Sequence, residues 1–217
     1  MTLSLLLLVT ACAPAETSTS AQSSSSSAAP SNALAPQVAP YEVPHAEMVG
    51  IRITYDGAVT TVSSNGRLHR LHGRFSFDAL SPNQRLFYLI EHRPPAGSED
   101  YRVRLLDLRS GHLREQPIAD KRNLETDMSG LPMARATTTD GVWVFTLYRG
   151  KQHSFVHALN TRHAFARCLD LPHGCCSGSG EWRLELDEEE EDLSAVAGSL
   201  RDTVTFNLVR RLGADAL

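Results

Sequence analysis

The chain has 217 residues, of which 41% are hydrophobic and 21% are charged, and its formal net charge is -4. These values are ordinary for a soluble globular domain, and they exclude a generally basic surface that would coat nucleic acid. The net charge alone does not indicate a binding partner.

The first twelve residues predict export. A short apolar run, Leu3 to Val9, ends in the sequence VTAC and is too short to cross a bilayer as a helix. No Lys or Arg precedes it. The VTAC ending resembles the lipobox of bacterial lipoproteins, in which a cysteine is lipidated and becomes the first mature residue. We therefore expect residues 1–12 to be a signal peptide and Cys12 to anchor the chain to the outer side of the cell membrane. The alternatives are an ordinary secretory peptide and an unrelated cysteine.

Residues 13–45 predict a disordered linker. They are rich in Ser, Ala, Pro and Thr and include a five-serine run at Ser23 to Ser27. Such a segment has almost no apolar side chains to bury, so it cannot offset the backbone entropy lost on folding. It would tether a folded domain, residues 46–217, to the lipid anchor.

The pattern of apolar and polar residues in the domain predicts a series of β-strands. No window of eleven or more residues shows helical periodicity. Ile51, Ile53 and Tyr55 alternate with polar residues, and Asn65-Gly66 is a strong hairpin turn. The sequence therefore predicts an all-β domain.

Two stretches of the domain repeat one pattern. Ser81 to Tyr88 and Thr138 to Phe145 are both a polar turn that leads into an apolar strand, 57 residues apart. Further on, Asp107 corresponds to Asn160, 53 residues later. Four-stranded antiparallel sheets that recur about every 40 to 50 residues are typical of β-propeller blades.

The strand after the first of these turns is apolar on both sides. Alternation places Leu86, Tyr88 and Ile90 on one face and Phe87 and Leu89 on the other. This pattern predicts an inner strand between two neighbouring sheets.

The segments FSFDALSPNQRLFYLIEH, YRVRLLDLRSGHL, IADKR and FVHALNTRHAFARCLDLP resemble uncharacterised exported bacterial proteins with WD40-like or YVTN-type β-propeller repeats. In that family a Leu-Ser-Pro-Asp-Gly-Arg turn commonly opens a blade. This chain keeps Leu80-Ser81-Pro82, has Asn83-Gln84 in place of Asp-Gly, and keeps the pair at Asp140-Gly141. The resemblance covers roughly Phe75 to Pro172 and implies a fold, with no catalytic residue.

The chain has material for about three four-stranded blades, whereas propellers usually close with four to eight. We expect a partial or short β-propeller with open sheet edges. The edges could be covered locally or by self-association, and a rearranged β-sandwich or a truncated product are the alternatives.

Three cysteines lie close together at Cys168, Cys175 and Cys176. In an exported chain, clustered thiols are more often oxidised than bound to metal, so a disulfide from Cys168 to one of the other two is expected. His173 lies between them and permits a zinc site, although the spacing lacks a clean CxxC knuckle.

His153 and His157 are weak metal candidates. They are four residues apart in a predicted strand, so they share a face with Phe155 between them. Without a carboxylate in a recognised motif, two polar-face histidines beside a half-buried aromatic ring are the better interpretation.

The acidic run Glu185 to Asp192 suggests calcium, but it lacks the ligand spacing and the glycine of calcium loops. We expect a solvated acidic loop.

The sequence contains no GxSxG, no SxxK and no glycine-rich phosphate loop, and it indicates no cofactor and no catalytic residue. The favoured function is a non-catalytic binding or scaffold module of the bacterial cell envelope with a protein or glycan ligand. The alternative is a cell-envelope hydrolase or metal-dependent enzyme with a site assembled from propeller loops.

Overall fold

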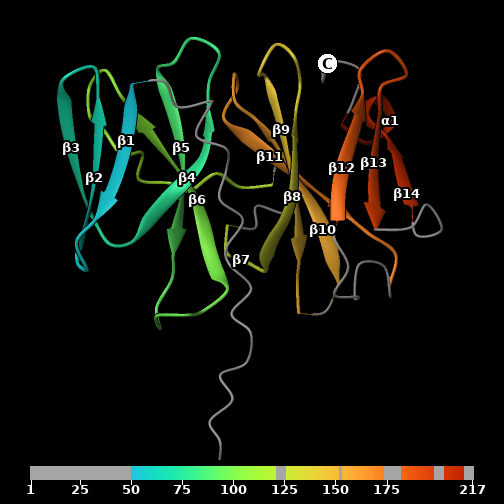
Figure 1. Ribbon diagram of the computed structural model, residues 1–217, viewed down its shortest axis with the longest axis horizontal. Coiled ribbons are helices and arrows are strands. Elements are labelled where there is room, and N and C mark those ends of the chain that lie inside the picture. Colours follow the sequence, from blue (N-terminus) through green and yellow to red (C-terminus); the bar gives the residue numbers. More distant parts are fainter. Residues whose placement is uncertain (1–49, 121–125, 152, 174–181, 198–202, 213–217) are drawn as a thin grey trace, which may run out of the picture. The chain divides into compact units, whose positions relative to one another are not determined.

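A computed structural model describes residues 50–120, 126–151, 153–173, 182–197 and 203–212. The chain divides into two units, Met1–Gln37 and Val38–Leu217, and all described residues belong to the second. They form fourteen strands and one short helix (Figure 1). The strands build four antiparallel sheets, in each of which the strands neighbour one another in chain order. The expected all-β, partial β-propeller fold is confirmed, but the described residues form two four-stranded and two three-stranded sheets, whereas about three four-stranded blades were expected.

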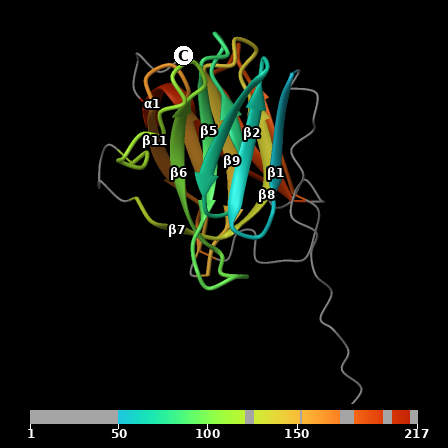
Figure 2. The same cartoon turned by 90° about the vertical axis from the view of Figure 1, so that its left-hand side faces the viewer.

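Two of the sheets have three strands. The first consists of β1 (Ile51–Tyr55), β2 (Val59–Ser64) and β3 (Arg67–His72). The last consists of β12 (Trp182–Asp187), β13 (Asp192–Ala197) and β14 (Thr203–Asn207), and the helix α1 (Leu208–Leu212) follows it. In Figure 2 the strands of the first sheet face the viewer.

The two middle sheets have four strands each. The second sheet contains β4 (Phe75–Leu80), β5 (Leu86–His92), β6 (Asp100–Asp107) and the short β7 (Met128–Ser129). The third contains β8 (Leu131–Thr137), β9 (Trp143–Arg149), β10 (Ser154–Asn160) and β11 (Phe165–Asp170).

The β4–β5 turn is held by its own side chains. Ser81 Oγ donates a hydrogen bond to Asn83 Oδ1 (2.7 Å) and accepts one from the backbone N–H of Leu86 (2.9 Å). The N–H of Arg85 donates to the same Asn83 oxygen (3.1 Å). Short side chains that bond to the nearby backbone favour turns over regular strands.

The β8–β9 turn repeats this network. Thr138 Oγ1 donates to Asp140 Oδ1 (2.8 Å) and accepts from the N–H of Trp143 (3.0 Å), while Val142 N–H donates to Asp140 Oδ1 (2.9 Å). Each of these residues stands 57 positions after its counterpart in the β4–β5 turn. The predicted repeat is therefore confirmed at the level of single hydrogen bonds.

The second predicted correspondence is also confirmed. Asp107 Oδ1 accepts hydrogen bonds from the backbone N–H groups two and three residues later (2.9 and 3.0 Å). Asn160 Oδ1 does the same (3.1 and 2.8 Å). Each side chain thus closes the turn after the third strand of its sheet.

The core consists of apolar clusters where neighbouring sheets meet. Tyr88 and Ile90 of β5 pack toward the third sheet, whereas Phe87 and Leu89 pack toward the first. This is the predicted division of the two faces of β5. The hydroxyl of Tyr88 also donates a hydrogen bond to the carbonyl of Thr161 (2.9 Å), which joins the second sheet to the third.

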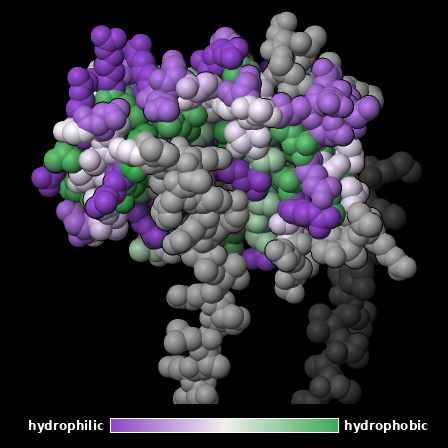
Figure 3. Space-filling model, turned by 45° about the horizontal axis from the view of Figure 1, so that its top comes forward, coloured by the Kyte–Doolittle hydropathy of each residue, from purple (hydrophilic) through white to green (hydrophobic). Residues whose placement is uncertain are grey.

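The first and last sheets bury only one face. On β12 the side chains alternate between buried and exposed, with Leu184 inside and Arg183 and Glu185 outside. Arg52 and Arg70 are exposed on the first sheet. In the space-filling view, hydrophilic side chains surround the apolar ones (Figure 3).

One turn position carries backbone strain that glycine would relieve. Gln84 has φ 54°, and its counterpart Gly141 has φ 70°. A non-glycine residue in this left-handed region costs about 1 kcal/mol, whereas glycine adopts it freely but loses more entropy on folding.

Gln84→Gly should therefore raise the free energy of unfolding by about 0.5 kcal/mol, measured by urea denaturation. The matched change Gly141→Ala should lower it by about 1 kcal/mol. A Cβ at Gly141 would meet its nearest atom, Pro82 Cγ, at an ordinary 3.7 Å, so the loss would report the backbone alone. Destabilisation by Gln84→Gly would contradict the argument.

Candidate functional site

A cavity of about 690 Å³ lies where the first strands of three sheets come together. Its walls include Ile51 of β1, Phe77 of β4 and Leu131 of β8, and residues of β5, β6 and β9 complete it. Aliphatic and aromatic side chains contribute much of its surface, and polar and charged side chains, among them Arg52, Arg74 and Glu99, stand between them. Concave sites that combine apolar walls with placed polar groups are typical of ligand sites.

A buried ion pair crosses this cavity wall from one sheet to the next. Arg135 Nη2 lies 2.5 Å from Asp78 Oδ1, and Arg135 Nη1 donates to the backbone carbonyl of Asp78. The side chains are 7% and 1% exposed, respectively. Arg135 Nε also donates to Thr146 Oγ1 (3.2 Å). The guanidinium therefore fixes β4 against β8 and β9 through three hydrogen bonds.

Two stacked tyrosines line the same cavity. The rings of Tyr101 and Tyr148 lie with their centroids 4.9 Å apart. Burial, followed by its neighbour Tyr148, raises the pKa of Tyr101 well above the ordinary value, and burial followed by Asp78 raises the pKa of Tyr148. Both phenols are thus neutral at physiological pH.

His92 adds a neutral polar group to the wall. Its Nε2 lies 2.9 Å from Ser76 Oγ. Burial, followed by the charge of Arg74, lowers the pKa of His92 below its ordinary value. Asp78 and Arg135 neutralise each other, whereas Arg52, Arg74 and Glu99 bring further charges to the lining.

Breaking the Asp78–Arg135 pair should cost stability. Arg135→Met should lower the free energy of unfolding by about 3 kcal/mol, because it leaves a buried carboxylate without its cation. The double variant Asp78→Leu/Arg135→Met should be more stable than the sum of the two single changes predicts, by about 2 kcal/mol in a urea double-mutant cycle.

The exposed pair Arg85–Asp107 provides the control, since its side chains are 54% and 17% exposed. Arg85→Met should cost at most about 1 kcal/mol. Equal losses at the two pairs would contradict the buried role of Arg135.

The predicted metal candidates come together only in part. His153 Nε2 lies 3.1 Å from Asp170 Oδ1, and the rings of His153 and His173 lie with centroids 6.4 Å apart. His153 and Asp170 line a second cavity of about 700 Å³. Within the described ranges, no group of three His, Cys, Asp or Glu side chains is placed to hold a metal ion.

His157 lies apart from this pair, although it shares a strand face with His153 and Phe155 as predicted. Phe155 contacts the His153 ring, and Tyr148 contacts both Phe155 and His157. The expected polar face is wrong, because Phe155 and His157 are 8% and 2% exposed. Both lie at the junction of the second and third sheets, where burial lowers the pKa of His157.

Of the cysteines, the structure describes Cys168 on β11, opposite His157 of β10. Cys12, Cys175 and Cys176 lie outside the described residues. The lipidation at Cys12 and the disulfide from Cys168 therefore remain predictions.

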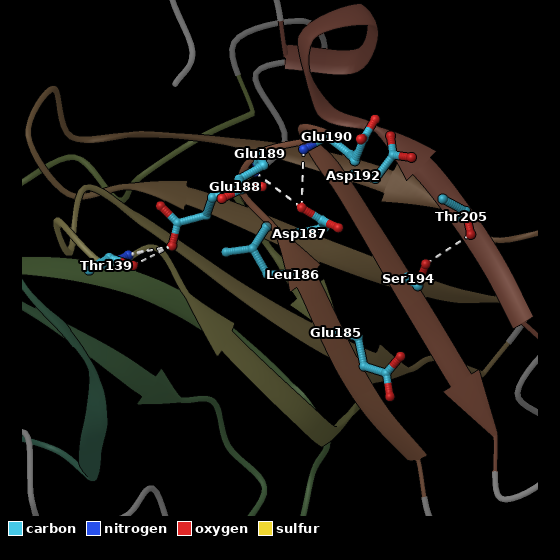
Figure 4. Close-up of a pocket in the computed structure, with 10 residues that line it drawn as sticks. All are labelled: Thr139, Glu185, Leu186, Asp187, Glu188, Glu189, Glu190, Asp192, Ser194 and Thr205. Atoms are coloured by element: carbon cyan, nitrogen blue, oxygen red, sulfur yellow. Dashed lines mark hydrogen bonds between the residues drawn. The ribbon is translucent and has the colours of Figure 1, made fainter.

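The acidic run forms the β12–β13 turn, and its side chains are mostly exposed, as expected. Asp187 Oδ1 accepts hydrogen bonds from the N–H groups of Glu189 and Glu190, both at 3.1 Å (Figure 4). Glu188 Oε1 accepts from the N–H (2.8 Å) and the hydroxyl (2.6 Å) of Thr139 in the β8–β9 turn. These carboxylates close a turn and join it to the neighbouring sheet.

Sequence reasoning did not find the cavity residues. Asp78 stands inside the apolar strand FSFDAL, and Arg135 stands 57 residues later, at the corresponding position of the repeat. Opposite charges at one repeat position were the available signal. Tyr101 and Tyr148 gave no such signal, because both fit an ordinary strand pattern.

No protein family and no curated protein matches this chain. Among solved structures, it is similar to hydrazine synthase from Kuenenia stuttgartiensis, with 14% identity and a TM-score of 0.41 over 72% of this chain and 48% of that one. It is similar to a "putative TolB" from Agrobacterium tumefaciens, with 11% identity and a TM-score of 0.33 over 67% and 52%. It is also similar to a prolyl endopeptidase, with 9% identity and a TM-score of 0.27 over 66% of this chain and 32% of that one.

The chain thus spans about half of the first two of these chains and about a third of the last. At these identities and TM-scores the likeness transfers no activity. The four consecutive antiparallel sheets themselves define a β-propeller-like protein.

Proposed function

We propose that this protein is a non-catalytic binding module of the bacterial cell envelope whose ligand occupies the cavity between β1, β4 and β8. The observation that supports it is the cavity itself, with apolar walls around the Asp78–Arg135 pair. Its volume of about 690 Å³ lies within the range of sites for small molecules and peptide segments.

The alternative is a cell-envelope hydrolase or metal-dependent enzyme. It is favoured by one contact, His153 with Asp170 beside the second cavity. A catalytic site needs convergent groups, and His157 is buried at the junction of two sheets rather than beside this pair. The binding function therefore has the stronger support.

Placing a larger side chain in the cavity should weaken ligand binding. Nile red, a neutral apolar dye, should bind the unmodified protein with an increase in fluorescence, and Leu131→Trp should weaken this binding about tenfold, or about 1.4 kcal/mol. Leu68→Trp is the matched control, because Leu68 is 70% exposed on β3 and does not line the cavity. If the two variants bind the dye equally, the cavity is not the binding site.

The location is a second part of the proposal: Cys12 carries a lipid anchor and displays the domain outside the cytoplasm. The structure's described part contains no helix long and apolar enough to cross a membrane. The proposal rests on the VTAC ending and the Ser-rich segment after it.

Cys12→Ser should release the protein from the membrane fraction and abolish acyl labelling, because the thiol that carries the lipid is lost. Fractionation and labelling with an alkyne fatty acid would measure both. The matched change Cys168→Ser should alter neither. Unchanged membrane association of the Cys12→Ser variant would refute the anchor.

A further inference from the structure

The cavity is lined by strand edges as well as by side chains. β1, β4 and β8 are each the terminal strand of their own sheet, so one edge of each strand has no strand partner within that sheet. All three contribute to the wall. An unpaired edge presents backbone N–H and C=O groups that a further strand can pair with. At β4, one such carbonyl, that of Asp78, already takes a side-chain donor from Arg135.

A second, independent observation is a buried acceptor without a partner. Asp78 is 1% exposed and lines the cavity. Its Oδ1 is bound by Arg135, but its Oδ2 has no hydrogen-bond partner among the described residues. A buried carboxylate oxygen without a donor is costly. A ligand that supplies an N–H group would relieve this cost.

These features select among ligand classes. The inner ion pair is self-neutralising, but Arg52, Arg74 and Glu99 also line the cavity, so its charges do not select a neutral ligand. An acyl chain would match the walls formed by Ile51, Phe77 and Leu131 but would leave Asp78 Oδ2 and the strand edges unpaired. An extended peptide offers apolar side chains and regularly spaced N–H and C=O groups together.

We propose that the cavity binds an extended, largely apolar peptide segment that pairs with an inner strand edge. This inference rests on the proposed binding function and names its ligand class. The chemistry required is a strand of alternating apolar and small polar residues with free backbone amides.

The probes are three fluorescein-labelled heptapeptides with blocked ends, in which Thr alternates with Val, Leu or Phe. Fluorescence anisotropy with the full chain should show saturable binding of at least one. Leu131→Trp should weaken it at least tenfold, whereas Leu68→Trp should leave it unchanged. Failure of all three peptides to bind would overturn the inference.

N-methylation tests the strand pairing without altering the protein. Alternate amides of an extended peptide point to one edge, so two methylated isomers of the best peptide block opposite edges. One isomer should bind at least tenfold more weakly than the unmethylated peptide. If both isomers bind as well as the parent, or if a fluorescent dodecyl chain without amides binds more tightly, the peptide class is wrong.

The dye experiment tests the binding cavity separately from the peptide class of its ligand. Nile red binding that is lost in Leu131→Trp, together with no preference for the unmethylated peptide, would retain the binding cavity and overturn the peptide inference. Loss of cavity dependence for both probes would overturn the proposed function as well.

Discussion

The contact on which the arrangement of the middle sheets depends is the ion pair between Asp78 of β4 and Arg135 of β8. Apolar packing is non-directional and tolerates sliding of one sheet against the next. A guanidinium that donates to a carboxylate, a backbone carbonyl and a threonine hydroxyl fixes a single position. A buried pair adds little net stability over an apolar replacement, so its contribution here is to specify how β4 stands against β8. That placement also shapes the cavity.

The repeat was predictable because its signal is local. A hydroxyl, then an Asn or Asp two residues on, then an apolar strand is enough to form the Ser81 turn and, 57 residues later, the Thr138 turn. The two faces of β5 were equally readable, because alternation decides which side chains point the same way. Gln84 takes the same left-handed conformation as its counterpart Gly141, with φ 54° beside 70°. The hydrogen bonds of the turn set the backbone conformation, and Gln84 adopts it.

The candidate site was not predictable in the same way, because it depends on which faces of separate sheets meet. His157 looked like a polar-face residue from its own strand alone. In the structure both faces of β10 are buried, so this histidine lies in the core beside Tyr148. Likewise, neither Asp78 nor Arg135 has a local pattern that identifies a partner 57 residues away. Neither strand alone signals such a pairing, and the sequence pointed to it only through the opposite charges at one repeat position.

The same logic applies to the outer sheets. A sheet between two others needs apolar residues on both faces, as β5 and β9 have. The first and last sheets instead place polar residues outward, with Arg52 and Arg70 on one and Arg183 and Glu185 on the other. Such faces are stable in water without a further sheet, in the way that terminal units cap a repeat array. Among the terminal strands of the four sheets, β1, β4 and β8 are the three that line the cavity.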